Sequence, residues 1–549
     1  MKVGNRKAWA AAALLMAVAA AALLLTQTLR SNVKDTVLVS SPEHPATLTA
    51  PDLPALSLQP TPMATPHLTP QPTPQIPTPR VIAQPTPTVV SAQPALEPIN
   101  KTYAGWVDPA SVGKPYGTMN GLLTFRGNPT RTFYGTGPAP LSPEVLWHFA
   151  GTPQLDLCSP TSWTQGVTLW CGTGWTGQPA IIDNWKGRTR VVVGTFAPGV
   201  HFLDATTGQQ WLPEYVVGDL VKGSVTIDPD GFPLVYFGSR DNYFRILAFD
   251  RSEPTELWRL SAYDVAPTVW NNDWDGASLV LKDYLFQGGE NSQFLIIKLN
   301  RSYDSDGLVV VDPELMFHSP GWDQELLNVL GDNNVSIEGG MTVIGNTLYF
   351  GNSGGLVQGW DISGLAEGRD PERVFRYWVG DDVDATVIAD GEGYIYVGVE
   401  YERGTARSQQ LGQMLKLNPA SDDPLVWAVD LRSATSDGVW ATAALTEQVV
   451  YVPTSAGYLY ALSRATGEVL WRKRLGGPIW SSPVVIDEVL IQADCNGTLY
   501  GYDISEPQAE PPELWQVTLG GCIESTPAVW EGVIYVGDRQ GGVYAVGDH

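Results

Sequence analysis

Histidine, cysteine and basic residues are all scarce in this chain. It holds six histidines and four cysteines in 549 residues, with no Cys-x-x-Cys pair and no Cys-x-x-Cys-His motif. These absences disfavour a cysteine-rich zinc site and a covalently attached haem. His148, His201 and His318 lie in or beside strand patterns, and the other histidines lie in a Pro-rich stretch or at the last residue. We therefore expect structural roles for them and no catalytic triad.

The deficit of positive charge lies after residue 100. Residues 101–549 carry 27 Lys or Arg against 54 Asp or Glu. A surface with net negative charge repels phosphate backbones. We expect no nucleic-acid partner.

One long apolar run, residues 8–25, follows Lys2, Arg6 and Lys7. As a helix its 18 residues would span roughly 27 Å, about the thickness of a bilayer core. Because the positive flank stays in the cytoplasm, the pattern predicts a cytoplasmic tip and a signal-anchor helix over residues 1–34. The rest of the chain would then lie outside the cytoplasm, in a single-pass protein of the cell membrane. The alternative is a cleaved signal peptide and a secreted protein.

Residues 35–102 are rich in proline and threonine, with 16 prolines between Pro42 and Pro98. Such a tract favours extended polyproline conformation, at about 3.1 Å per residue. We expect a disordered linker that holds the following domain away from the membrane. A recognition ligand for another domain is the alternative.

Glycine and aromatic residues are abundant, with 56 Gly, 20 Trp and 21 Tyr. Eight short apolar segments recur over 343 residues in seven steps, a mean period of 49, which is typical of β-propeller blades. We predict an all-β fold over residues 103–549, with eight blades. Seven is the alternative, because the third unit has Met316 or Phe317 where a tryptophan is expected. The segments are Val191–Gly194, Val235–Gly238, Leu285–Gly288, Leu348–Gly351, Ile395–Gly398, Val450–Pro453, Leu490–Ala493 and Ile534–Gly537.

A repeated motif accompanies these segments. Residues 461–471 have the pattern A-x-S-x-x-T-G-E-x-x-W, in which Thr466-Gly467 makes a turn and Trp471 supplies an apolar body that packs against the adjacent blade. Related patterns occur at residues 203–211 and 248–258. This motif resembles the tryptophan-docking repeat of the pyrroloquinoline quinone (PQQ) propeller superfamily, which has the quinoprotein alcohol dehydrogenase-like fold. The stretch Phe125-Arg-Gly-Asn-Pro-Thr-Arg131 also resembles the lead-in of bacterial PQQ-like repeat proteins.

Closure of the ring can be predicted from the two ends of the array. After Ile534–Gly537 the last blade lacks an outermost strand, whereas residues 143–149 have a strand pattern and no blade of their own. We expect residues 143–149 to complete the last blade, because this pairing removes exposed edges.

Four cysteines outside the cytoplasm can form two bridges in three connectivities. Cys158 and Cys171 lie 13 apart in a segment without a blade pattern, and we pair them there. Cys495 and Cys522 are expected on the same face of neighbouring blades, which makes a second bridge. A metal site is the weaker alternative.

Propellers generally bind ligands around the central channel. Alignment of the innermost strands places carboxylates and tryptophans at one equivalent position, where they could hold Ca²⁺ or stack on a planar ligand. Glu338, Asp384 and Glu524 are the expected ligands if Ca²⁺ binds. The candidates at the channel mouth are Lys222, Asp264, Glu338, Asp384, Trp440, Trp480 and Glu524, with Thr176 and Asp382 beside them.

The resemblance also implies chemistry. PQQ dehydrogenases use Ca²⁺ held by carboxylate and amide oxygens, an Asp base, a Trp floor and often a disulfide between adjacent cysteines. This chain has no adjacent Cys pair, and its acidic residues do not match the family's ligand motifs one by one. We expect no cofactor, with PQQ and Ca²⁺ as the alternative in a dehydrogenase of alcohols or sugars.

Two insertions interrupt the repeat, at residues 151–175 and 319–334. Both join an outermost strand to the next innermost strand, so both are expected on one face. We therefore interpret the domain as a non-catalytic binding platform for a protein or cell-envelope ligand. In some relatives the same architecture scaffolds envelope protein assembly.

Overall fold

The computed structural model describes residues 103–152, 155–163, 166–433 and 437–549. The expected signal anchor (1–34) and linker (35–102) lie outside the described residues. Within the described part of the chain, no helix is both long and apolar enough to cross a membrane.

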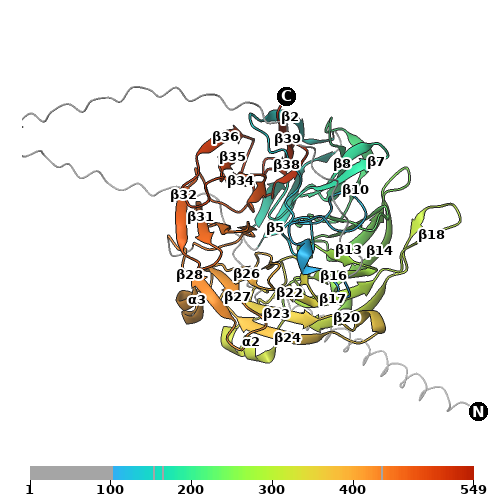
Figure 1. Cartoon of the computed structure of the whole chain (residues 1–549). Coiled ribbons are helices and arrows are strands. Elements are labelled where there is room, and N and C mark those ends of the chain that lie inside the picture. Colours follow the sequence, from blue (N-terminus) through green and yellow to red (C-terminus); the bar gives the residue numbers. More distant parts are fainter. Residues whose placement is uncertain (1–102, 153–154, 164–165, 434–436) are drawn as a thin grey trace, which may run out of the picture. The chain divides into compact units, whose positions relative to one another are not determined.

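Eight antiparallel sheets follow one another around a common axis (Figure 1). Each has four strands, which follow one another along the chain except in blade eight, and blade one carries the additional short strand β1 (Gly121–Leu122). The eight-bladed prediction is confirmed. Blades one to four contain β7 (Ala180–Trp185), β8 (Arg188–Thr195), β9 (Gly199–Asp204) and β10 (Gln210–Val216); β11 (Thr226–Ile227), β12 (Leu234–Gly238), β13 (Tyr243–Ala248) and β14 (Thr255–Ser261); β15 (Leu279–Leu281), β16 (Tyr284–Gly288), β17 (Gln293–Lys298) and β20 (Glu314–Pro320); and β21 (Thr342–Ile344), β22 (Thr347–Phe350), β23 (Leu356–Asp361) and β24 (Glu372–Trp378).

Blades five to seven have the same plan, and blade eight takes its outermost strand from far upstream. They contain β25 (Ile388–Ala389), β26 (Ile395–Gly398), β27 (Met414–Leu417) and β28 (Leu425–Val429); β29 (Ala444–Leu445), β30 (Val449–Pro453), β31 (Tyr458–Ser463) and β32 (Val469–Arg474); β33 (Val484–Ile486), β34 (Val489–Ala493), β35 (Thr498–Asp503) and β36 (Glu513–Thr518); and β37 (Ala528–Trp530), β38 (Val533–Gly537), β39 (Val543–Gly547) and β2 (Glu144–Phe149).

The remaining elements are short and lie outside the four-stranded sheets. Six of the strands form three two-stranded hairpins, and the α-helices have seven and six residues. These elements are β3 (Gly151–Thr152), β4 (Leu155–Asp156), β5 (Cys158–Trp163), β6 (Gly166–Cys171), β18 (Ser302–Tyr303), β19 (Val309–Val310), α2 (Gln324–Leu330), α3 (Ala406–Leu411), η1 (Pro109–Ser111), η2 (Ala262–Asp264) and η3 (Leu365–Glu367).

The eight apolar segments are the second strands of the eight blades. Each blade is covered on both faces by its neighbours, so both sides of these strands are buried and the sequence is apolar without alternation. β30 and β34, for example, are buried at every residue.

In several blades a tryptophan on the outermost strand packs against the next blade. Trp147 Nε1 donates to Ala205 O at 2.8 Å, and Trp427 Nε1 donates to Arg464 O at 3.2 Å. The turn glycine of the next blade lies against each indole, so a Cβ on Gly467 would stand 2.9 Å from Trp427. The predicted wedge role is thus confirmed at these positions.

Blade three keeps the same packing without an indole. Phe317 pairs with Ile296 at the register where Trp258 pairs with Ile246 in blade two. Its ring lies 5.7 Å from that of Trp360 in blade four. The third unit is therefore a full blade with phenylalanine at the docking position.

The ring closes as the sequence predicted. β2 pairs with β39 in antiparallel register, from Glu144 opposite Gly547 to Phe149 opposite Val543. Figure 1 shows β2 beside β39 near the C-terminus. The fourth strand of the last blade thus comes from residues that precede the first blade.

Residues 121–136, here called the hub segment, connect the blades at the axis. β1 pairs with β7 of blade one, and in each other blade the segment is hydrogen-bonded to the innermost strand or to the residue just before it. The bonds are Ile227 N to Leu123 O (2.7 Å), Thr124 Oγ1 to Ser278 O (3.0 Å), Val343 N to Pro129 O (2.8 Å), Ala389 N to Thr130 O (3.3 Å), Leu445 N to Tyr134 OH (2.7 Å), Arg126 Nη1 to Pro483 O (3.0 Å) and Thr136 N to Val529 O (3.2 Å).

Candidate functional site

An inner ring of eight side chains surrounds the axis, one from each blade. Each lies four residues before the first residue of an innermost strand. The hub segment forms its hydrogen bonds with residues that lie three to five positions after the ring member of the same blade. The inner ring thus forms one mouth of the axis, with the hub segment beneath it. Its members are Thr176, Lys222, Asp275, Glu338, Asp384, Trp440, Trp480 and Glu524.

The sequence alignment was wrong in blade three. Asp264 lies in η2 with its side chain exposed, and Asp275 occupies the position in the inner ring. The connection between β14 and β15 is long, since it holds η2 and the ten residues 265–274 before the ring position. An alignment of the blades that allows no such insertion selects Asp264, which precedes the true ring position.

An outer ring lies beside the inner one and comes from the turns between second and third strands. Each member follows the end of an apolar segment by two residues, and of these positions only Cys495 was singled out from the sequence. A search at that fixed offset would have found it. The members are Phe196, Arg240, Glu290, Ser353, Glu400, Ser455, Cys495 and Arg539.

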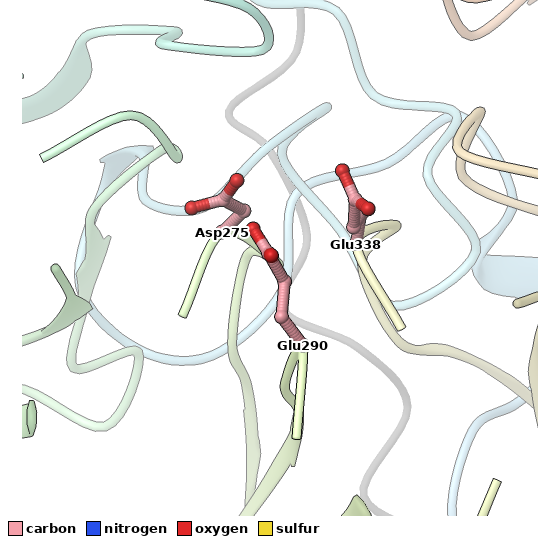
Figure 2. Close-up of side chains that lie close together, drawn as sticks. All are labelled: Asp275, Glu290 and Glu338. Atoms are coloured by element: carbon pink, nitrogen blue, oxygen red, sulfur yellow. The ribbon is translucent and has the colours of Figure 1, made fainter. Parts of the chain in front are cut away.

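The two rings gather three carboxylates between blades three and four. Asp275, Glu290 and Glu338, here called the blade-three triad, each have a carboxylate oxygen within 4.8 Å of the others (Figure 2). Lys222 of blade two forms an ion pair with Asp275, and its Nζ lies 3.4 Å from Glu290 Oε1. This triad therefore contains a built-in cation.

A second group, the blade-five triad, consists of Asp382, Asp384 and Glu400. Their oxygens also lie within 4.8 Å of one another. Ser353 links the two triads, because its Oγ lies 3.2 Å from Asp384 Oδ1 and 3.4 Å from Glu338 Oε1. Six carboxylates thus share one sector of the mouth.

Proton affinity in this sector is strongly altered. Burial, with repulsion from Asp384 and Asp382, raises the pKa of Glu400 well above its ordinary value. Burial and the charge of Asp384 likewise raise the pKa of Glu338. Burying several carboxylate charges together costs free energy unless positive charge balances them. The sector therefore favours the binding of a proton or a cation.

The next sector of the mouth, in blades six and seven, is aromatic. Trp440 and Trp480 stack with ring centroids 6.0 Å apart and an interplanar angle of 27°. Glu524 is ion-paired with Arg539 at 2.7 Å. Glu338 and Asp384 are therefore neighbours, but Glu524, predicted as the third Ca²⁺ ligand, belongs to a separate pair.

Both predicted disulfides are present. Cys158–Cys171 joins the ends of the β5–β6 hairpin, and Cys495–Cys522 joins blade seven to blade eight at the mouth. Cys522 lies two residues before Glu524 of the inner ring. The second bridge thus fixes neighbouring blades beside the site.

Both insertions lie on the face that carries the mouth. Thr173 N, just after β6, donates to Asp538 O in the mouth-side turn of blade eight at 3.1 Å. Asn334 O, at the end of the second insertion, accepts a hydrogen bond from Arg403 Nη2 at 3.0 Å. On β6, Val167 and Leu169 are 71% and 63% exposed.

The mouth does not fit pyrroloquinoline quinone, which carries three carboxylates. Such an anion requires unpaired cations, whereas this mouth gathers six carboxylates in one sector. The cationic side chains of the two rings are engaged, Lys222 with Asp275, Arg240 with Asp273 and Arg539 with Glu524. We derive no chemical step through a quinone.

Comparisons with known proteins agree with the fold. A family model described as outer membrane protein assembly factor BamB matches residues 412–547. A solved europium-containing methanol dehydrogenase is similar at 14% identity and a TM-score of 0.52, over 78% of this chain and 98% of that chain. The quinohemoprotein alcohol dehydrogenase from Comamonas testosteroni is similar at 14% identity and a TM-score of 0.51, over 78% and 80%. No match was found among curated proteins.

The class of protein follows from these observations. This chain has an eight-bladed PQQ-like propeller, with the fold of the quinoprotein alcohol dehydrogenases. The resemblance stated from the tryptophan-docking motif is confirmed. At 14% identity the likeness to the dehydrogenases extends to the fold alone.

Proposed function

We propose that this protein is a non-catalytic binding propeller of the cell envelope. Residues 1–34 would anchor it in the membrane and residues 35–102 would hold it away from the bilayer, outside the cytoplasm. The face around the mouth would capture a protein or another cell-envelope ligand. The proposal depends chiefly on the exposed aliphatic pair of the β5–β6 hairpin.

Val167 and Leu169 alternate along β6, so both side chains lie on one face of the hairpin. Burying one such side chain against a partner contributes about 1.5–3 kcal/mol. The Cys158–Cys171 bridge constrains the hairpin, and so reduces the entropy lost on binding. A polypeptide ligand could thus bind there without ordering a loop.

The family model supports a partner of this kind, because its description names an outer membrane protein assembly factor and its match runs from the third strand of blade five through blade eight. That support comes from likeness over residues 412–547 only. The hairpin itself lies outside the matched region, so its role needs a separate test.

Site-specific photo-crosslinking in intact cells tests the proposal. A photoreactive residue at Leu169 of the full chain should give a defined adduct. The same residue at Val374, which is 56% exposed on the rim strand β24, should not. Introducing Val167→Asp should abolish the adduct at 169. Equal adducts at both positions, or none at 169, would contradict the proposal.

A quinoprotein dehydrogenase is the second candidate. The fold shared with two alcohol dehydrogenases favours it, whereas the carboxylates gathered at the mouth argue against it. Purified protein would be mixed with Ca²⁺ and pyrroloquinoline quinone and examined for bound quinone absorbance and dye-linked oxidation of alcohols or sugars. Absence of binding at micromolar quinone removes this candidate.

A further inference from the structure

The blade-three and blade-five triads have the same construction. Glu290 and Glu400 hold equivalent places in the outer ring, and each lies beside the inner-ring aspartate of its own blade, Asp275 or Asp384. The third carboxylate comes from Glu338 in the first triad and from Asp382 in the second. The repeat of the fold has thus produced two related oxygen clusters.

The two triads differ in how their charge is balanced. Lys222 places its ammonium between Asp275 and Glu290. Arg403 is a cation beside the blade-five triad, but its charge offsets only part of the rise that burial causes in the pKa of Asp382, and its guanidinium forms its hydrogen bonds elsewhere. It donates to Ser353 O and Asn334 O, and lies 3.4 Å from Asp332.

Buried oxygens in the blade-five triad also remain without donors. Asp382 is 3% exposed and Glu400 is 1% exposed. Among the described residues, Asp382 Oδ1 and Glu400 Oε1 have no hydrogen-bond partner. Such atoms are costly in a protein interior unless a ligand satisfies them.

We propose that the blade-five triad of Asp382, Asp384 and Glu400 binds one Ca²⁺, and that Lys222 takes the place of a cation in the blade-three triad. Two oxygens that are each about 2.4 Å from Ca²⁺ lie at most about 4.8 Å apart, which the triad satisfies. Its ligands are all oxygens, which favours a hard cation over zinc or copper. This site requires no quinone and is independent of polypeptide binding at the hairpin.

Stoichiometry and matched variants test the proposal. The full chain in detergent would be stripped with a chelator, dialysed against buffered Ca²⁺, and analysed by atomic emission. We expect one Ca²⁺ per chain. Glu400→Gln should weaken binding by about tenfold or more, because it removes a charged ligand. Glu290→Gln, at the equivalent place in blade three, should leave binding unchanged, as should Glu392→Gln on the exposed turn of blade five.

Lys222→Met provides a second test, because it removes the built-in cation and should raise the stoichiometry to two. If this variant does not fold, the pair Glu400→Gln and Glu290→Gln decides alone. Luminescence of bound Tb³⁺ excited through tryptophan gives an independent signal, which should fall in Glu400→Gln. The proposal is overturned if the wild-type chain binds no Ca²⁺ at millimolar concentration, or if Glu400→Gln and Glu290→Gln weaken Ca²⁺ binding equally.

Discussion

Arg126 donates a hydrogen bond from Nε to the carbonyl oxygen of Arg131, 3.3 Å away. The two guanidiniums then diverge. Arg126 donates to Ala443 O at 2.8 Å in blade six, and Arg131 Nε donates to Met341 O at 2.8 Å in blade four. Both side chains are fully buried, and burial lowers the pKa of each, for Arg131 to about 10. One turn of the hub segment therefore binds two separate parts of the ring, in blades four and six.

Arg126→Ala should lower the free energy of unfolding by about 3–5 kcal/mol, because buried carbonyl oxygens of blades six and seven would lose their donors. The measurement is urea unfolding followed by tryptophan fluorescence. As a control, Arg188→Ala removes a guanidinium that is 65% exposed and paired with Asp204. Its effect should stay below about 1 kcal/mol, and comparable losses in both variants would contradict the role of the hub segment.

Gly467→Ala should be more destabilising than Gly187→Ala. Both glycines have a positive φ, +76° and +82°, which costs about 1–2 kcal/mol for alanine. Only Gly467 lies against an indole, since its added Cβ would stand 2.9 Å from Trp427, whereas nothing lies within 4 Å at Gly187. The same unfolding measurement gives the difference between the variants, which reports the contact between blades five and six. Equal losses would show that this contact contributes little.

Stability should decline in acid partly because of His201. Burial lowers its pKa from 6.5 to about 4. Since the unfolded state binds the proton more tightly, the contribution of His201 is complete above about pH 6.5 and is lost as the pH falls towards 4, up to about 3 kcal/mol. Unfolding of His201→Gln at about pH 7 and pH 4.5 should show a smaller acid-induced loss than wild type. His148→Gln, on exposed β2, should keep the wild-type loss, and an unchanged loss in His201→Gln would refute the assignment.

The two disulfides should contribute differently to global stability. Cys495–Cys522 closes 27 residues and joins two blades, so replacing both cysteines by serine should cost about 3 kcal/mol. Cys158–Cys171 constrains a hairpin outside the blades, which can open locally without unfolding the ring. Its double serine variant should therefore melt closer to wild type but give a weaker crosslink at Leu169. The reverse order of melting temperatures would contradict this view.

The sequence was most informative where a physical constraint repeats. Each second strand is buried on both faces and ends at a tight turn, so the same pattern of apolar residues and a small residue occurs eight times. Residues 143–149 were recognisable because they had a strand pattern without a blade. The Cys495–Cys522 pair was predictable by counting strands within the blades, because this count places both cysteines on one face of the ring.

The candidate site was less accessible, because its two rings come from different parts of each blade. Asp275 was missed since the connection before β15 has no repeat marker. Glu290 and Glu400 lie in turns that alignment of innermost strands does not include. The bonds of the hub segment were also invisible, because Arg126 contacts residues more than 300 positions away.

The pairing of β2 with β39 has a consequence for biosynthesis. The final blade needs residues 144–149 and residues 543–547 at once, so the earlier segment must wait until almost the whole polypeptide has been made. Seven blades can acquire their strands in order during synthesis, but the eighth cannot. Truncation shortly before residue 543 should leave β2 without a partner, in a species that quality-control proteases would recognise.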